Sequence, residues 1–570
     1  KRRAPSEILS QLNNRLTLLV GGPRDWPARQ QTLYAAIEWS YELLTEREQR
    51  LFRQLGVFHG GCTLDAVEMI CTPPEAAREH ATAGNQLTLL ENLQDKNLLQ
   101  STHPHLTPDQ LRYSMLETIR EYAVYQLHLA GEAIETERRQ RDWCLHLAEQ
   151  AEQHLRGPEQ MSWLNRLEQE TLNIRAALSW CLAHPAEIEA GLRLVGALYW
   201  FWHLHSHFSE GREWVDKMLA IPIAPDAPLS TRRALAKVLS IASRLHGFEG
   251  NRTRAAAFSE ASLTLALDIG EVDEIVFALT TPALMFGSTG PDQQRVVTLA
   301  EEMLPLCQAA DDQFNVAQLL DNVLGPAAAA QGELVRAEAL HEEALALRRS
   351  LGDIDGIAWS CFLLAALART RGNEQRAQNL FEESRKLWQQ IGNRRMYAAA
   401  LNELGHLALR QEQYFQAQAL FEENLAMHEG FGDRYRMALA QCALAAVACQ
   451  QGKYEVTRSY LQTLATVVRE IDRPWLVADY FSTAAELVYQ TGATKEAVQL
   501  MSAAHAALDR LPRRTAVNNM PHEKLLTAAR VELGPESFDQ AWQEGRAMTV
   551  STGITRTLAV IADTRSVNLN

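Results

Sequence analysis

Small and apolar residues return at helical spacing along most of the chain, and the pattern repeats with a period of about 40 residues. Glycines suited to ending helices recur at this period, with one double step, at Gly250, Gly290, Gly332, Gly372, Gly452 and Gly492. Glu412 stands at the glycine position inside the double step. A second series keeps the same period, at Leu351–Asp353, Ile391–Asn393, Phe431–Asp433 and Ile471–Arg473. Two series that share one period predict a repeated structural unit.

Each period has room for two amphipathic helices of about four turns, joined by short turns. Neither helix can bury its apolar stripe alone, so successive pairs must stack on one another. Small residues recur seven positions before the turn and would let neighbouring helices approach closely, at Gly325, Ala365, Gly405, Ala445 and Ala485. The pattern therefore predicts a mainly α-helical chain that contains an α-solenoid.

The segment before Gly131 follows a different pattern. Helices are expected at Thr32–Leu44, at Glu46–Leu55, from Leu64 with Thr63 as N-cap, and at Leu87–Lys96. Asn97–Ser101 and Leu111–Met115 flank a polar turn and are expected to pair as strands. The order of helices followed by a hairpin predicts a winged-helix-like module.

Composition narrows the classes of function. The net charge of −15 disfavours a nucleic-acid-binding surface across the whole molecule. The eight cysteines form no Cys-x-x-Cys pair, and we interpret them as reduced, buried residues of a cytoplasmic protein. No apolar run reaches the roughly 18 residues that a membrane helix needs, so no membrane partner is expected.

The unit Ile357–Trp388 resembles a tetratricopeptide repeat. Ala365, Gly372, Ala377 and Phe381 match that family's small-residue, glycine, alanine and aromatic positions. The period of this chain exceeds the family's usual length of about 34 residues and implies longer helices. Departures from the family pattern, where glycine or alanine is usual, stand at Arg295, Glu412 and Thr457.

The N-terminal segment resembles bacterial STAND-class regulators, which are signal-transducing ATPases with an NB-ARC nucleotide module. The resemblance runs through Arg29–Cys71, the stretch LLENLQDKNLLQ, Tyr113–Ala123 and the C-terminal Ala528–Thr549. In that family the matching N-terminal segment is the winged helix that follows the ATPase core. The resemblance therefore implies a sensor region of such a regulator, which is commonly a transcription factor.

The same resemblance assigns a nucleotide-state relay to Met115, Leu116 and Glu117. These residues occupy the positions of the family's Met-His-Asp motif, whose histidine reads bound ADP. Leu116 departs from the motif, because a leucine side chain cannot donate a hydrogen bond to a phosphate.

No cofactor and no enzymatic activity are expected in this chain. The sequence has no G-x-x-x-x-G-K-[S/T] motif, which would cradle phosphates. The resemblance places ATP or ADP in an ATPase module that we expect upstream of Lys1, so the full-length protein could be an NTPase. No His-Glu-x-x-His or Gly-x-Ser-x-Gly motif occurs either, so neither a metal site nor catalytic residues are expected.

The pattern and the resemblance together divide the chain into six expected segments. These are the end of a missing ATPase module at 1–28, a winged-helix-like domain at 29–130, a helical linker at 131–210, the tetratricopeptide-like solenoid at 211–500, a C-terminal helical cap at 501–550 and a tail at 551–570.

The first helices of the repeats are the candidate effector-binding surface. In a tetratricopeptide-like register their side chains line the concave face, where amide, aromatic, guanidinium and imidazole groups suit the capture of a peptide or a small molecule. This register selects Asn322, Trp359, Phe362, Arg369, Asn402, His406, Arg410, Cys442, Ser482 and Glu486. A packed or solvated solenoid interior is the alternative interpretation.

Three functions remain open at this point. The first is the sensor and autoinhibitory region of a STAND-type ATPase regulator, which binds a protein, peptide or small-molecule effector and contacts its own ATPase module. The second is a protein–protein interaction scaffold without switching. The third is a DNA-binding winged helix, which the acidic residues Asp65, Glu68, Glu75, Glu79 and Glu91 disfavour.

Overall fold

A computed structural model describes residues 33–71, 83–102, 111–248, 251–286, 291–510 and 523–563. These residues form two compact units. Unit 1 comprises 33–155, 159–201 and 209–241, and unit 2 comprises 156–158, 202–208 and the chain from 242 onward, in each case within the described residues. The expected fold class is confirmed, because helices dominate both units and one small sheet lies in unit 1.

Unit 1 begins with the winged-helix-like module. Its helices are α3 (Leu33–Glu42), α4 (Glu46–Leu55), α5 (Leu64–Cys71), α6 (Ala83–Asp95) and α7 (Glu117–Leu129). Its antiparallel sheet has the order β1-β3-β2 and consists of β1 (Cys62–Thr63), β2 (Gln100–Thr102) and β3 (Arg112–Ser114). The expected hairpin is β2–β3, in which Ser101 lies opposite Tyr113.

Two details of this module differ from the sequence prediction. Asn97 adopts a left-handed backbone with φ of 57°, so the strand expected from Asn97 begins only at Gln100. The two-residue strand β1 is too short to leave a periodic pattern in the sequence. The expected polar turn at 103–110 lies outside the described residues.

Local chemistry explains why α4 begins where it does. The Thr45 hydroxyl accepts from the Glu48 amide, and the Glu48 carboxylate accepts from the Thr45 amide at 2.8 Å, which forms a capping box. Lys96 pairs with the buried Glu48 at 2.9 Å and connects α4 to the end of α6. The core behind α4 is aromatic, with Phe52 and Tyr122 fully buried.

The helices after the module complete unit 1 and lead into unit 2. They are α8 (Ala133–His154), α9 (Gln160–Gln169), α10 (Thr171–Ala183), the 3₁₀ turn η3 (Pro185–Glu187), α11 (Ile188–Ala197), α12 (Tyr199–Leu204), α13 (Phe208–Leu219) and α14 (Leu229–Phe248). Arg112 of β3 connects the module to them, because it pairs with the buried Glu170 and donates to the carbonyl of Gly61.

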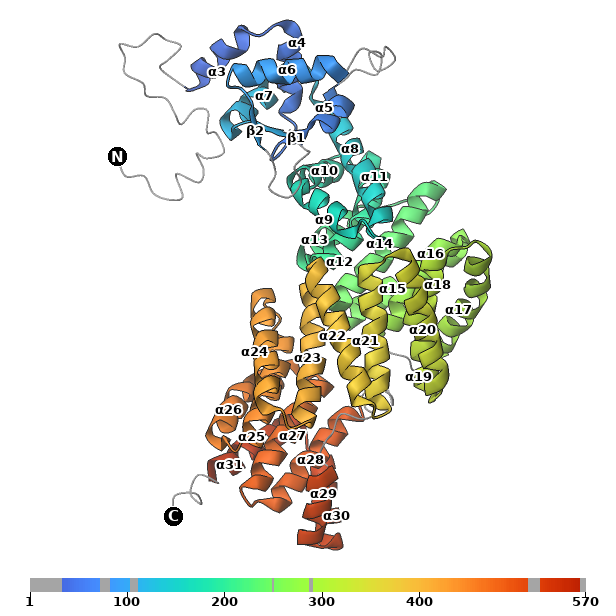
Figure 1. Ribbon diagram of the computed structural model, residues 1–570, viewed down its shortest axis with the longest axis vertical. Helices are drawn as coiled ribbons and strands as arrows, with labels where there is room; N and C mark the ends of the chain where they lie inside the picture. The colour runs from blue at the N-terminus through green and yellow to red at the C-terminus, as the bar shows by residue number, and fades with distance from the viewer. Residues whose placement is uncertain are drawn as a thin grey trace, which may run out of the picture. The chain divides into compact units, whose positions relative to one another are not determined.

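Unit 2 contains the solenoid. It starts with α15 (Arg252–Ile269), α16 (Val272–Phe286), α17 (Pro291–Ala309), α18 (Gln313–Leu319), the π-helix η4 (Leu320–Leu324) and α19 (Gly325–Gln331). A regular array of antiparallel helices follows (Figure 1): α20 (Leu334–Leu351), α21 (Ile354–Thr370), α22 (Glu374–Ile391), α23 (Arg394–Arg410), α24 (Tyr414–Phe431), α25 (Arg434–Gln450), α26 (Tyr454–Ile471), α27 (Pro474–Gln490) and α28 (Thr494–Leu508).

A left-handed residue separates the helices of this array at every twentieth position. Positive φ values occur at Gly332, Gly352, Gly372, Gly392, Glu412, Gly432, Gly452, Asp472 and Gly492. Both sequence series therefore mark helix ends, the first after the odd-numbered helices of the array and the second after the even-numbered ones. Glu412 adopts the glycine conformation with φ of 60°, which explains why the period survives the substitution. Gly250 and Gly290 lie outside the described residues.

Small residues bring the helices together as expected. A Cβ atom on Gly405 would lie 2.6 Å from a ring carbon of Phe421, and one on Gly325 would overlap the ring of His341. Ala365, Ala445 and Ala485 at the equivalent positions are fully buried. Glycine or alanine is therefore required where the odd-numbered helix meets the next even-numbered one.

The C-terminal helices α29 (Glu523–Leu533), α30 (Pro535–Arg546) and α31 (Val550–Asp563) pack around α27 and α28. The sequence predicts a tail from residue 551, whereas the structure places α31 there. Ile554 and Ile561 lie two turns apart on one face of α31 and are fully buried in the core of α27 and α28. Within the described residues, no helix combines the length and the apolar character that crossing a bilayer requires.

Candidate binding groove

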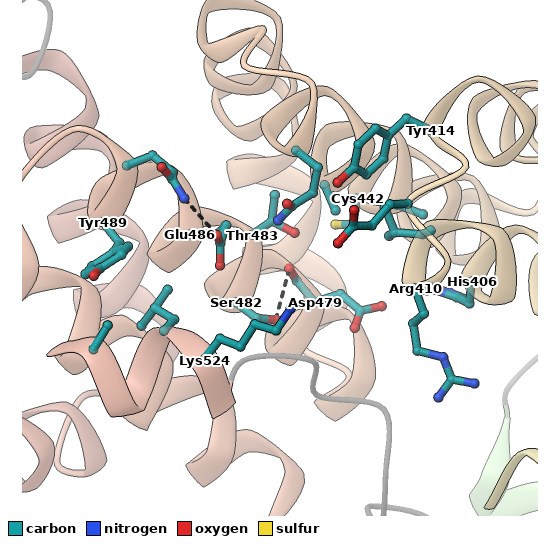
Figure 2. A pocket seen from close by; sticks show the side chains of 18 of the residues that line it. His406, Arg410, Tyr414, Cys442, Asp479, Ser482, Thr483, Glu486, Tyr489 and Lys524 are labelled. Atoms are coloured by element: carbon teal, nitrogen blue, oxygen red, sulfur yellow. Dashed lines mark hydrogen bonds between the residues drawn. The ribbon is translucent and has the colours of Figure 1, made fainter. Parts of the chain in front are cut away.

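A groove of about 730 Å³ opens on one face of the solenoid. Three odd-numbered helices in succession, α23, α25 and α27, supply most of its wall, and α29 adds one side (Figure 2). The residues that line it are Glu374, His406, Leu409, Arg410, Glu412, Tyr414, Cys442, Ala443, Ala446, Gln450, Asp479, Ser482, Thr483, Glu486, Tyr489, Gln490, Lys524, Leu525 and Ala528.

The repeat explains why these residues converge. Positions 406, 446 and 486 are related by the repeat period, as are 410, 450 and 490, and all six line the groove. On α27, Asp479, Ser482, Thr483 and Glu486 follow the i, i+3, i+4, i+7 spacing of one helix face. The groove is therefore the side of the odd-numbered helices that does not pack against the even-numbered ones.

Asp479 is an acidic group on this face of α27. Its carboxylate oxygens accept no hydrogen bond and pair with no cation within the part of the chain that the structure describes. Burial raises the pKa of this carboxyl to about 7, because a charge is costly where little water can solvate it. Figure 2 shows the Asp479 side chain directed into the space between the labelled residues.

Basic groups lie on the opposite wall of the groove. The Arg410 guanidinium is 3.4 Å from the Glu374 carboxylate, and burial lowers the pKa of Arg410. Beside it, the His406 ring makes an edge contact with Phe421 at 5.1 Å between centroids. Burial lowers the pKa of His406 as well, so the imidazole is neutral at physiological pH.

The floor between the two walls is formed by small residues of α25. Cys442 is buried, and burial raises the pKa of its thiol well above the usual range. A protonated thiol is neither a strong nucleophile nor a metal ligand. The Ser482 hydroxyl donates to the carbonyl of Ala478 at 2.5 Å. The arrangement suits reversible binding rather than covalent chemistry.

The sequence-predicted site residues fall into two groups. His406, Arg410, Cys442, Ser482 and Glu486 line the groove. The others lie earlier in the solenoid and do not line the groove: Asn322 of η4, and Trp359, Phe362, Arg369 and Asn402 of the array. The Trp359 indole donates to Asn322 at 2.8 Å, Phe362 packs on Phe381, and Arg369 pairs with Glu403. Whether any of them binds an effector stays a prediction.

Several groove residues were not selected from the sequence. Asp479 lies one turn before Ser482 on the same helix face, so the helical spacing could have identified it. Tyr489 and Gln490 continue that face toward the helix end. Lys524 could not be found by periodicity, because α29 lies outside the regular array and contacts it only through tertiary packing.

The residues of the predicted relay lie in unit 1. Leu116 precedes the first turn of α7 and is 53% exposed, without a side-chain cap. Glu117 pairs with Arg120 at 2.8 Å, and Met115 is half-buried. The leucine side chain provides no donor to a phosphate, so the residues present do not fit a nucleotide contact at this point. The relay role stays a prediction.

Comparison with known proteins finds similarity to a helical-repeat family and to regulators of transcription. A family model described as tetratricopeptide repeat matches residues 315–390. Proteins of Mycobacterium tuberculosis and Mycobacterium bovis named "Putative HTH-type transcriptional regulator" are 32% identical over 320 residues, which is 56% of this chain and 35% of theirs. The chain thus spans about a third of the length of these relatives.

Solved structures show weaker likeness. A STAND protein with a tetratricopeptide repeat sensor from Pyrococcus horikoshii aligns with 90% of this chain and 72% of its own, at a TM-score of 0.38 and 12% identity. The apo form of RapI aligns with 66% of this chain and 99% of its own, at a TM-score of 0.40 and 12% identity. The tetratricopeptide-like repeats predicted from the sequence are confirmed by the family model, and the relatives named as transcriptional regulators agree with the predicted resemblance to a regulator.

Proposed function

We propose that this chain is the sensor and autoinhibitory region of a STAND-type signal-transducing ATPase that regulates transcription. An effector would bind in the groove of α23, α25 and α27. The observation that carries this proposal is the groove itself, which has the size of a small-molecule site and combines charged, aromatic and small residues. Similarity to proteins named as transcriptional regulators supports the regulatory part.

The mechanism follows from thermodynamic linkage. An effector can shift a conformational equilibrium only if it binds the two states with different affinity. A groove built from three successive helix pairs provides such a difference, because a change in their stacking angle would change its width. In this proposal the winged-helix-like module passes the change to an ATPase module that holds ATP or ADP and that this chain does not contain.

The test compares nucleotide exchange in the longer protein with and without the solenoid. Release of a fluorescent ADP analogue should be faster when the solenoid is removed, because the autoinhibitory contact is then lost. The intact protein with Glu429→Gln, an exposed residue of α24 that does not line the groove, serves as the control for a change outside the groove. Equal exchange rates in the intact and the solenoid-free protein would count against autoinhibition.

A scaffold without switching predicts a different outcome. A protein partner would then copurify with the chain and bind equally well in the presence of ADP or ATP. An effector that changes nucleotide exchange would exclude this alternative.

Direct DNA binding by the winged-helix-like module is disfavoured on electrostatic grounds. Asp65 and Glu68 of α5 and Glu91 of α6 place negative charge where a recognition helix would meet phosphates. Glu75 and Glu79 lie outside the described residues. A gel-shift experiment with the whole chain should show no binding that weakens with added salt.

A further inference from the structure

The groove holds the carboxylate of Asp479. Among the described residues, no side chain donates to the Asp479 carboxylate oxygens, and burial is the one cause that raises its pKa. A carboxylate that is partly shielded from water and has no counter-charge destabilises the folded chain. Such a cost at the wall of a cavity indicates a group that is kept for something other than folding.

Two other charges of the groove have partners within the chain. Arg410 has Glu374 at 3.4 Å, and Glu486 accepts from the Gln490 amide at 3.2 Å. The ionisable residues on the wall are the acids Glu374, Glu412, Asp479 and Glu486 and the bases Arg410 and Lys524, apart from the tyrosines, a buried thiol and a histidine with a lowered pKa. The acids outnumber the bases, so the field inside the groove favours a positive ligand.

A metal ion is a poorer match for this charge than an organic cation. Ions such as Ca²⁺ need several oxygen ligands that converge on one point. Within the described residues, Asp479 belongs to no cluster of three His, Cys, Asp or Glu side chains close enough to hold an ion. An organic cation needs one carboxylate and a wall that excludes water, and aromatic rings strengthen its binding.

We propose that the groove binds a small organic cation, whose protonated amine or guanidinium group pairs with the carboxylate of Asp479. The volume of about 730 Å³ accommodates a molecule of drug size rather than a folded partner. Tyr414 and Tyr489 line the groove and present rings to the apolar part of the ligand, and the small side chains of Ala443 and Ala446 leave room for it. This inference rests on the proposed function and names the effector's chemistry.

The experiment uses three probes with one carbon skeleton: 2-phenylethylamine, 2-phenylethanol and phenylacetate. Binding to the whole chain is measured by ligand-observed NMR and calorimetry at about pH 8, where the Asp479 carboxyl is ionised. Wild type is compared with Asp479→Asn, which keeps the shape of the side chain and removes the charge. Glu429→Gln is the matched control, because Glu429 is an exposed acid on α24 that does not line the groove.

The amine should bind wild type more tightly than the alcohol, and Asp479→Asn should weaken the amine by about tenfold or more, the usual size of a charge-assisted contact. The alcohol should bind both proteins equally, and Glu429→Gln should match wild type for all probes. Equal binding of amine and alcohol to wild type, or an amine affinity that Asp479→Asn leaves unchanged, would overturn the proposal. Preferential binding of phenylacetate would overturn it as well.

Two further arms separate related outcomes. A tripeptide with a central lysine or arginine tests whether the cation belongs to a peptide. If that peptide binds through Asp479 and the free amine does not, the proposal of a small molecule is wrong. Nucleotide exchange in the longer protein, with and without the solenoid, is measured separately. If the exchange rate is unchanged but the amine binds through Asp479, the sensor role alone is rejected. If the exchange rate changes but the amine does not bind through Asp479, the cation site alone is rejected.

Discussion

Two carboxylates of the solenoid have opposite surroundings. Asp321 of η4 is fully buried and accepts from His341 at 2.9 Å, from Arg348 at 3.1 Å and from Ser360 at 2.5 Å. Asp479 of α27 is partly buried and has no comparable partner among the described residues. The first carboxylate joins η4 to α20 and α21, and the second borders a cavity.

The contrast separates two uses of the same amino acid. A buried charge with a full set of partners is part of the fold, and removing it leaves those partners unsatisfied. A charge without partners in a groove opposes folding, and its removal should relieve that cost. Opposite signs of the stability change are therefore the clearest test of the distinction.

The largest effect is expected for Asp321→Ala. The change leaves the guanidinium of Arg348 and the ring of His341 buried without this acceptor, and the free energy of unfolding should fall by about 3–5 kcal/mol. Urea unfolding followed by circular dichroism measures it. A loss of stability below about 1 kcal/mol would contradict the structural role of Asp321 and its contrast with Asp479.

A second pair of variants tests the packing beside the groove. Gly405→Ala places a methyl group against Phe421 and should cost about 1–3 kcal/mol. Gly430→Ala on α24 is the matched control, because the new Cβ meets nothing closer than 3.6 Å. The control should be stabilising by about 0.5–1 kcal/mol, as for other helical glycines. Equal losses in both variants would contradict the close approach of α23 and α24.

Asp479→Asn should stabilise the chain at high pH. The pKa of this carboxyl is about 7 in the folded state, above its ordinary value of 3.8. The unfolded chain therefore loses this proton first, and the stability contributed by Asp479 falls as pH rises from about 4 to about 7. The substitution removes that loss and should raise the free energy of unfolding by about 1–2 kcal/mol at about pH 8, after screening by water in the groove.

The control for this prediction is the same pair of proteins at about pH 4. There the folded carboxyl is protonated and the unfolded one is only partly ionised, so the free energies of unfolding should agree to within about 0.5 kcal/mol. Thermal and urea unfolding measure the difference at each pH. A destabilised Asp479→Asn protein at both pH values would show that the carboxylate has partners like those of Asp321.

The smallest effect concerns the turn at Glu412. This residue has φ of 60°, and Glu412→Gly should stabilise the chain by about 1 kcal/mol because glycine adopts the left-handed region without strain. Gly452→Ala at the equivalent turn should lower the free energy of unfolding by a similar amount, because φ is 72° there. No atom lies within 4 Å of the new Cβ, so this loss reports the backbone conformation and not a clash. Differential scanning calorimetry compares the two, and shifts of the same sign would contradict the conformational explanation.

The comparison also shows what the sequence could reveal. The repeat period and the helix ends could be predicted, because glycine and small residues have local backbone and packing reasons to recur. The difference between Asp321 and Asp479 could not, because it depends on residues 20 to 39 positions away on other helices. The groove could be predicted only in part for the same reason. Helical spacing selected five of its residues, but the side on α29 comes from outside the repeat and depends on tertiary packing.

The left-handed residue at every twentieth position has a consequence for how such a chain can vary. One extra residue inside a helix would rotate every following side chain by about 100° and turn the groove face into the core. Insertion of one whole repeat, by contrast, restores both the turns and the faces. Length changes in the array should therefore occur as whole helix pairs, while the exposed side chains of the groove can be exchanged one at a time with little effect on the helices that carry them.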